Sequence, residues 1–424
     1  MVINDYRRSS IKFDVRGIRI SADEIFFYTG LVLWLIQVYI SRTVYINTFG
    51  NRLVTVIRYF CMLIFAVKIV LTEKTIQKRA AAVFLIAAAL FVVVQRQIHT
   101  GMPLIQILLL VYAARNIPFK RICTVMLWTC LPLWLLPVMT DKIGIHQLER
   151  SIYIQRVREY LNFNYVSFPS IYFNNIIYCA LYVFTDPRRL AKGGKYEAEQ
   201  KTASWILILI LSAAAFWVYR ATDTSLPLLI AGIYIALYVA VVKLRMPILK
   251  NNLLWRIIAL VSFPVLAVVS YIMAKNYNWR VGWQFKLDQM THNRVSLAYQ
   301  GIKNYGVHLF GTQIVENTDT TKGRYFYIDS GYIKNMINYG LIVFILILIY
   351  YTVIFYAAVV ENDKVLVIWM ICVALYSLFN NLLLSPAENG SLFAFWYAAD
   401  LLAWHRKKKN RKRVFKRREI ERAA

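Results

Sequence analysis

Arg294 lies at the start of a segment whose residue spacing predicts a short helix, and its guanidinium could bind an anion there. The sequence from residue 293 reads NRVSLAYQGIKNYG, in which Asn293 is a suitable helix N-cap and Gly306 a suitable C-terminal stop. Helical spacing places four apolar or aromatic residues on one face: Val295, Tyr299, Ile302 and Tyr305. A guanidinium in the first turn of a helix, next to free backbone N–H groups, is suited to binding phosphate. The alternative is that Arg294 only extends toward lipid headgroups.

A second arginine-bearing segment, RVREYLNFNYVSFP, contains Arg156 and Arg158. These arginines are the other candidate cations for an anionic ligand. Side chains that could accept a proton from a hydroxyl are His292 and the carboxylates Glu159, Asp288, Glu316 and Asp329. Asp329 stands just before an apolar helix, so it could serve either as a base or as the helix cap.

Arg58 interrupts an apolar stretch, VTVIRYFC, where a charged side chain is costly unless it lines a wet cavity or reaches outward. Aromatic residues of the segment around Arg294 could stack on the rings of a ligand or belong to the aromatic belt of a membrane interface. They are Trp279, Trp283, Tyr299 and Tyr305.

The elements that must position these residues are membrane-spanning helices. The chain has 424 residues, of which 59% are hydrophobic and 17% charged, a balance typical of an all-α polytopic integral membrane protein. About twelve stretches approach the roughly twenty apolar residues that a spanning helix needs. They are residues 24–40, 53–71, 80–95, 101–114, 121–139, 169–184, 203–219, 225–242, 256–274, 331–357, 365–383 and 390–404.

The net charge of +28 is concentrated in short segments between these stretches, which argues against a nucleic-acid-binding surface. The positive-inside rule predicts that both termini are cytoplasmic. The domains expected are a cytoplasmic segment over 1–23, a transmembrane domain over 24–404 and a basic cytoplasmic tail over 405–424 that binds anionic membrane lipid. Two long outward-facing loops with short amphipathic helices are expected at 140–168 and 275–330, and loops of this length are usually functional.

Segments of the second loop resemble the Wzy-type polysaccharide polymerases of the O-antigen polymerase and ligase superfamily. The similarity lies in THNRVSLAYQGIKNYGVHLFG and in YFYIDSGYIKNMINYGLIVF, where an arginine opens an amphipathic helix and an Asp-x-Gly-Tyr enters the next span. The first loop is similar to that family's other outer loop, with Asn162 in place of the usual glycine. The motifs match the family at Arg294 and, less closely, at Arg158, which are the candidate catalytic arginines; Asp329 and His292 are the candidate catalytic bases. The candidate substrate-binding residues are Arg156, Arg58, Tyr299 and Tyr332.

The resemblance further implies a membrane glycosyltransferase of the GT-C kind in the bacterial cytoplasmic (inner) membrane. It would join oligosaccharide repeat units carried on undecaprenyl pyrophosphate, and other polysaccharide-export proteins would be partners. The chain has no G-x-x-x-x-G-K-[ST], G-x-G-x-x-G or H-E-x-x-H motif, so neither a cofactor nor a metal site is expected. Two alternatives remain: a ligase that passes the glycan to another acceptor, and a flippase for lipid-linked oligosaccharides.

Five cysteines lie within or beside apolar stretches without paired spacing, which predicts buried, unpaired thiols. They are Cys61, Cys123, Cys130, Cys179 and Cys372.

Overall fold

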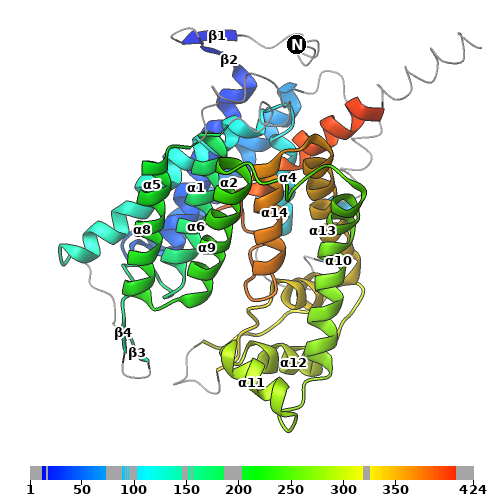
Figure 1. The fold of residues 1–424 in the computed structure, drawn as a ribbon. Coiled ribbons are helices and arrows are strands. Elements are labelled where there is room, and N and C mark those ends of the chain that lie inside the picture. Colours follow the sequence, from blue (N-terminus) through cyan, green and yellow to red (C-terminus); the bar gives the residue numbers. More distant parts are fainter. Residues whose placement is uncertain are drawn as a thin grey trace, which may run out of the picture.

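Apolar helices dominate the computed structural model of the protein (Figure 1). The structure describes residues 12–15, 18–72, 88–90, 92, 94, 103–145, 151–153, 156–185, 203–318 and 325–406. Among these described residues, seven helices are long and apolar enough to cross a membrane, namely α1 (Ala22–Arg42), α2 (Tyr45–Thr72), α5 (Phe119–Lys142), α8 (Trp205–Thr222), α9 (Ser225–Tyr238) with its π-helical extension (Val239–Lys243), α10 (Leu253–Lys275) and α13 (Gly331–Glu361). Three shorter apolar helices are α4 (Pro103–Ala113), α6 (Phe168–Val183) and α14 (Lys364–Tyr376). A 3₁₀ turn (Gly390–Phe393) leads into a last helix over 394–406.

Each of these helices overlaps one of the predicted spans. The predicted span at 80–95 is described only at residues 88–90, 92 and 94, which are helical. The total of twelve spans and their orientation in the membrane remain predictions. Large apolar side chains on the surface of the helices agree with a lipid environment. In α8 and α10, Ile206, Leu209 and Leu253 are at least 70% exposed.

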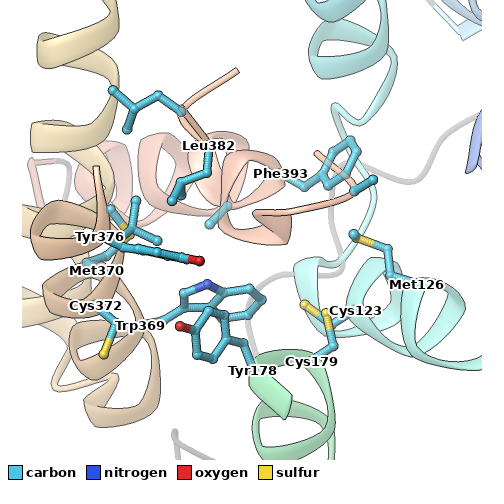
Figure 2. Packing of buried hydrophobic residues seen from close by; sticks show 14 of the residues in the cluster. Cys123, Met126, Tyr178, Cys179, Trp369, Met370, Cys372, Tyr376, Leu382 and Phe393 are labelled. Carbon is cyan, nitrogen blue, oxygen red and sulfur yellow. The ribbon is translucent and has the colours of Figure 1, made fainter. Parts of the chain in front are cut away.

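The centre of the molecule is formed by α6 and α14, whose residues are buried almost all round. Figure 2 shows Trp369 of α14 beside Tyr178 of α6, with their ring centroids 5.5 Å apart. The five cysteines are buried and unpaired, as predicted. This apolar centre fixes the helix ends that carry the polar residues.

Both long loops lie at the same end of the molecule, which we call the loop end (Figure 1). The first loop contributes a hairpin of β3 (Ser151–Tyr153) and β4 (Arg156–Arg158), and the second contributes α11 (Gly282–Met290) and α12 (Arg294–Tyr305). The hairpin of β1 (Lys12–Val15) and β2 (Ile18–Ser21) and the last helix lie at the opposite end. The expectation of an amphipathic helix in the first loop is wrong for residues 143–145, 151–153 and 156–167, which contain strands and turns instead.

A tight backbone contact joins the second loop to α13. Gly311 and Gly340 both have positive φ, at +86° and +80°, and a Cβ on Gly340 would lie 2.3 Å from the backbone nitrogen of Gly311. Hydrogen bonds run across the contact from Thr312 N to Ile337 O (2.9 Å) and from Leu341 N to His308 O (2.9 Å). The Leu-Phe-Gly sequence at 309–311 therefore docks on the kink of α13 and fixes the return of the loop into the helices.

One predicted helix is shorter than expected. The apolar stretch 365–383 predicts a continuous helix, but α14 ends at Tyr376 and turns follow to residue 389. Ser377 O accepts a hydrogen bond from Gly331 N (2.9 Å), and Asn381 Oδ1 accepts one from Asn335 Nδ2 (2.8 Å). The chain thus exchanges helical hydrogen bonds for polar contacts with α13, which hydropathy alone does not reveal.

Candidate active site at the loop end

The helix that carries Arg294 has the predicted bounds but a different cap. α12 runs from Arg294 to Tyr305 and ends at Gly306, whose φ is +66°. Asn293 precedes the helix but has a left-handed backbone (φ +64°) and makes no side-chain cap. Instead Asp288 Oδ1 accepts a hydrogen bond from Ser296 N at 2.9 Å, while its Oδ2 accepts one from the Tyr277 hydroxyl at 3.0 Å. The prediction of Asn293 as N-cap is therefore wrong, because a carboxylate from α11 reaches the same helix end.

The buried face of α12 also differs from the predicted one. Leu297, Ala298 and Gly301 are buried, and a Cβ on Gly301 would lie 2.3 Å from the side chain of Ile328. Of the predicted face, Ile302 and Tyr305 are partly buried against the core. This packing turns Arg294 toward the segment that returns to α13.

Arg294 pairs with Asp329 at the entrance of α13. The distance from Arg294 Nε to Asp329 Oδ2 is 3.5 Å, with side-chain exposures of 20% and 12%. Burial raises the pKa of Asp329 above its usual value, although Arg294 and Lys334 oppose the shift. The helix-cap interpretation of Asp329 is wrong, because the cap of α13 is Ser330, whose hydroxyl accepts from Ile333 N at 3.5 Å. Asp329 is thus the counter-ion of Arg294.

A second pair holds the returning segment in place. Lys334 Nζ lies 2.7 Å from Glu316 Oε1, and the same oxygen accepts a hydrogen bond from Ile328 N at 3.2 Å. Lys334 also lies over the ring of Tyr327, 4.0 Å from its centroid. Glu316 therefore anchors the second loop to α13 next to Asp329.

Residues of the first loop reach the same neighbourhood. Arg158 Nε lies 3.7 Å from Asp223 Oδ2, and its Nη2 donates to Asp223 O at 3.2 Å. Partial burial and the nearby guanidinium groups of Arg294 and Arg158 lower the pKa of His292. The imidazole is therefore neutral at neutral pH. Arg158, His292 and Arg294 thus share one electrostatic environment. Arg156 belongs to β4, and its side chain lies outside the described part of the chain.

Tyrosines line the space between the two loops. Burial and the charge of Asp329 raise the pKa of Tyr165, in the first loop, to about 12, although Arg294 opposes the shift. Burial likewise raises the pKa of Tyr325 and of Tyr327. These phenols stay protonated and can donate hydrogen bonds to an anionic or hydroxyl-bearing ligand.

Two charged residues of this neighbourhood were not found from the sequence. Arg42, the last residue of α1, and Glu388, between α14 and the last helix, interact electrostatically with one another and with Tyr327. The sequence feature that could have identified them is an ionisable residue within or beside an apolar stretch. In a membrane protein such a residue indicates a functional position by default. Lys334, in the first turn of α13, carries the same signal.

Tyr299 lines a pocket on the outer side of α12. The pocket has a volume of about 420 Å³ and is bordered by Tyr299, Gln300, Lys303, Asn304, Tyr325 and Phe326. Tyr325 also lies within electrostatic range of Arg294 and Asp329, so the pocket adjoins the ion pair. Aromatic faces beside amide groups are suited to a carbohydrate.

The remaining two predicted substrate-binding residues lie apart from this cluster. Tyr332 is fully buried in the contact between α13 and α14, where its hydroxyl donates to Ala374 O at 2.9 Å. Arg58 is half-buried in α2, and its Nε makes no hydrogen bond among the described residues. The described contacts do not connect either residue with Arg294.

Within the described residues, no three His, Cys, Asp or Glu side chains are grouped so that they could hold a metal ion. The loop end instead brings together Arg42, Arg158, Arg294 and Lys334 from both loops and two helices. Comparison of the chain with protein-family models, with curated proteins and with solved structures gave no match.

Proposed function

We propose that this chain is a membrane glycosyltransferase that polymerises oligosaccharide repeat units carried on undecaprenyl pyrophosphate. The reaction would occur on the outer face of a bacterial cytoplasmic membrane and release undecaprenyl pyrophosphate. The observation that carries the proposal is the position of Arg294, which lies in the first turn of α12 and shares its surroundings with Arg158 and neutral His292. The resemblance of the second loop to Wzy-type polymerases supports the same assignment.

A pyrophosphate ester of a sugar is an activated donor, so the main task of the protein is to stabilise the leaving group. Negative charge grows on the pyrophosphate as the bond to the anomeric carbon breaks. Guanidinium groups are suited to bind this charge. At the N-terminus of α12, Asp288 already accepts from Ser296 N, so the proposed binding rests on the arginines. Arg294 would bind the pyrophosphate, and Arg158 would approach it from the first loop.

Asp329 would orient Arg294 before the substrate arrives. Its distance of 3.5 Å from Arg294 Nε is longer than a strong charge-assisted hydrogen bond of about 2.7–2.9 Å, which leaves the guanidinium able to turn to a phosphate. Neutral His292, next to Arg294, is one candidate to accept the proton of the attacking hydroxyl.

The pocket beside Tyr299 would hold sugar residues of the substrate. Its lining runs along α12 from Tyr299 to Lys303 and Asn304, and Tyr325 on its border lies within electrostatic range of Arg294. A saccharide attached to a pyrophosphate at Arg294 would therefore extend along this helix, with Tyr299 and Tyr325 available for stacking.

A deletion strain tests the proposal against its alternatives. Loss of a polymerase should cause accumulation of single repeat units on the lipid at the outer face. Loss of a ligase would leave polymer on the lipid carrier, and loss of a flippase would leave single repeats on the cytoplasmic side. Either of these last two results, restored by the wild-type gene, would contradict the polymerase assignment.

A further inference from the structure

Glu388 is an ionisable residue that the structure places inside the helical assembly. The chain from Ser377 to Asn389 forms turns between α14 and the 3₁₀ turn at Gly390. Burial raises the pKa of Glu388 to about 7, although Arg42, Ser385 and Lys334 oppose the shift. The residue nevertheless keeps some exposed surface. Glu388 is thus a partly exposed residue whose carboxyl group is surrounded by protein.

The backbone on both sides of Glu388 is held by other helices. Asn175 of α6 donates to Ala387 O at 2.9 Å and accepts from Gly390 N at 2.9 Å. Asn389 donates to the hydroxyl of Tyr351 of α13 at 3.0 Å. These buried hydrogen bonds fix the position of Glu388, which is the preorganisation that a catalytic group requires.

Charged and titratable groups face Glu388 from every element packed around it. They are Arg42 of α1, Tyr172 of α6, Tyr327 of the second loop, Lys334 of α13 and Tyr376 of α14. Tyr376 lies within electrostatic range of both Glu388 and Arg294, so the two residues belong to one neighbourhood at the loop end. Lys334 is engaged by Glu316 at 2.7 Å.

Asp329 is poorly placed to act as the base, because it adjoins the guanidinium that would bind the leaving group. When a nucleophile attacks a sugar from the face opposite the leaving group, its base lies on that opposite face. Glu388 lies in the same neighbourhood as Arg294 and makes no direct pair with it among the described contacts. Its raised pKa also brings it close to the value at which a general base works best at neutral pH.

We propose that Glu388 is the general base that accepts the proton of the acceptor sugar's hydroxyl. This proposal rests on the function proposed above. The hydroxyl oxygen forms a bond to the anomeric carbon of the donor sugar, and the bond from that carbon to the pyrophosphate oxygen breaks. The electron pair leaves with the pyrophosphate, and the hydroxyl proton moves to the Glu388 carboxylate and then to solvent.

Purified protein in lipid vesicles, supplied with a synthetic lipid-pyrophosphate oligosaccharide, tests the proposal. The Glu388→Gln variant should lower kcat by about 100-fold or more while changing KM little, since general bases typically contribute about 10²–10⁴-fold. Wild-type kcat should rise with pH through about 7, because the base must be deprotonated, and this rise should be missing from the residual activity of Glu388→Gln. Glu388→Asp should retain part of the activity together with the pH-dependent rise.

Glu361→Gln is the matched control, since Glu361 is a partly buried carboxylate at the opposite end of α13, paired with His405 at 2.8 Å. Its kcat and pH profile should equal those of the wild type. A Glu388→Gln protein that keeps at least a third of the wild-type kcat, with the same pH profile, would overturn the base assignment alone. A wild-type protein without transferase activity would instead overturn the proposed function, and the base assignment would fall with it.

An infrared measurement provides a readout that does not need turnover. In the wild type, part of the protonated-carboxyl band should disappear as the pH is raised through about 7, and this change near pH 7 should be missing from Glu388→Gln. A change near pH 7 that is the same in both proteins would contradict the proposal. Equal thermal unfolding of the two proteins would show that the variant is folded.

Discussion

Carboxylates at the two ends of the molecule are bound in different ways. At the end opposite the loops, Asp363 is buried, accepts from Leu366 N at 3.1 Å and receives the hydroxyls of Tyr182 at 3.0 Å and Tyr397 at 3.2 Å. Glu24 there accepts two contacts of 3.0 and 2.9 Å from Arg121. At the loop end, by contrast, Asp329 lies 3.5 Å from Arg294, and Asp223 lies 3.7 Å from the Nε of Arg158.

This difference distinguishes charges that hold the fold from charges that can bind a ligand. A buried carboxylate with short hydrogen bonds on both oxygens has little capacity left to accept further hydrogen bonds, and its contacts contribute to stability. A loosely paired guanidinium in partly enclosed surroundings can exchange its partner for a phosphate at small cost. Three carboxylates at the loop end are bound as closely as those at the opposite end. Glu316 pairs with Lys334 at 2.7 Å and holds the second loop on α13. Glu159 pairs with Lys142, and Asp288 accepts from Ser296 N at 2.9 Å and from the Tyr277 hydroxyl at 3.0 Å.

The largest effect is expected from Arg294→Ala, which removes the group proposed to stabilise the leaving pyrophosphate. Transfer by the reconstituted protein should fall by about 100- to 1000-fold, the usual range for loss of one such donor. Arg294→Lys should restore little activity, because the ammonium lacks the planar fork of the guanidinium.

Arg280→Ala is the control for this experiment. Arg280 belongs to the same loop, where it lies over the ring of Trp279 at 5.4 Å. Its removal should leave the rate unchanged, so a comparable loss in both variants would point to general loop charge in place of a specific site.

A smaller effect should separate the two ends directly. Asp329→Asn should lower turnover by about 10-fold through poorer orientation of Arg294, with little change in the free energy of unfolding. Asp363→Asn should lower stability by about 1–3 kcal/mol, because it weakens buried hydrogen bonds, and should leave turnover per folded molecule unchanged. Thermal unfolding and initial rates should be measured on both variants. A loss of stability in Asp329→Asn and a loss of turnover in Asp363→Asn would contradict the assigned roles of the two carboxylates.

The smallest effect on the chemistry is expected from Gly311→Ala. A Cβ there would lie 2.2 Å from the backbone oxygen of Asn338, and φ is +86°, so the loop must shift away from α13. The free energy of unfolding should fall by about 1–3 kcal/mol. Gly282→Ala, in the same loop and with nothing within 4 Å of its Cβ, should have no such cost, and equal destabilisation of both variants would refute the docking role.

Helix positions and the bounds of α12 could be predicted because they depend on local spacing, on Arg294 at one end and on Gly306 at the other. The cap of that helix could not, because Asp288 reaches it from a different helix. Glu388 and Arg42 were missed for a similar reason. They lie at opposite ends of the chain and meet only after α1, α6 and α13 have packed, so no sequence spacing connects them.

The central claim is that arginines of the loop end stabilise the leaving pyrophosphate, in the place where many glycosyltransferases use a divalent cation. The most direct measurement is transfer by purified protein on a synthetic lipid-pyrophosphate repeat in excess EDTA, with Arg294→Ala assayed in parallel. The wild type should form polymer in EDTA at a rate that added Mg²⁺ or Mn²⁺ changes little, and Arg294→Ala should be about 100- to 1000-fold slower under either condition. Polymer formation that stops in EDTA and is restored by a divalent cation, in wild type and Arg294→Ala alike, would contradict this role of the arginines.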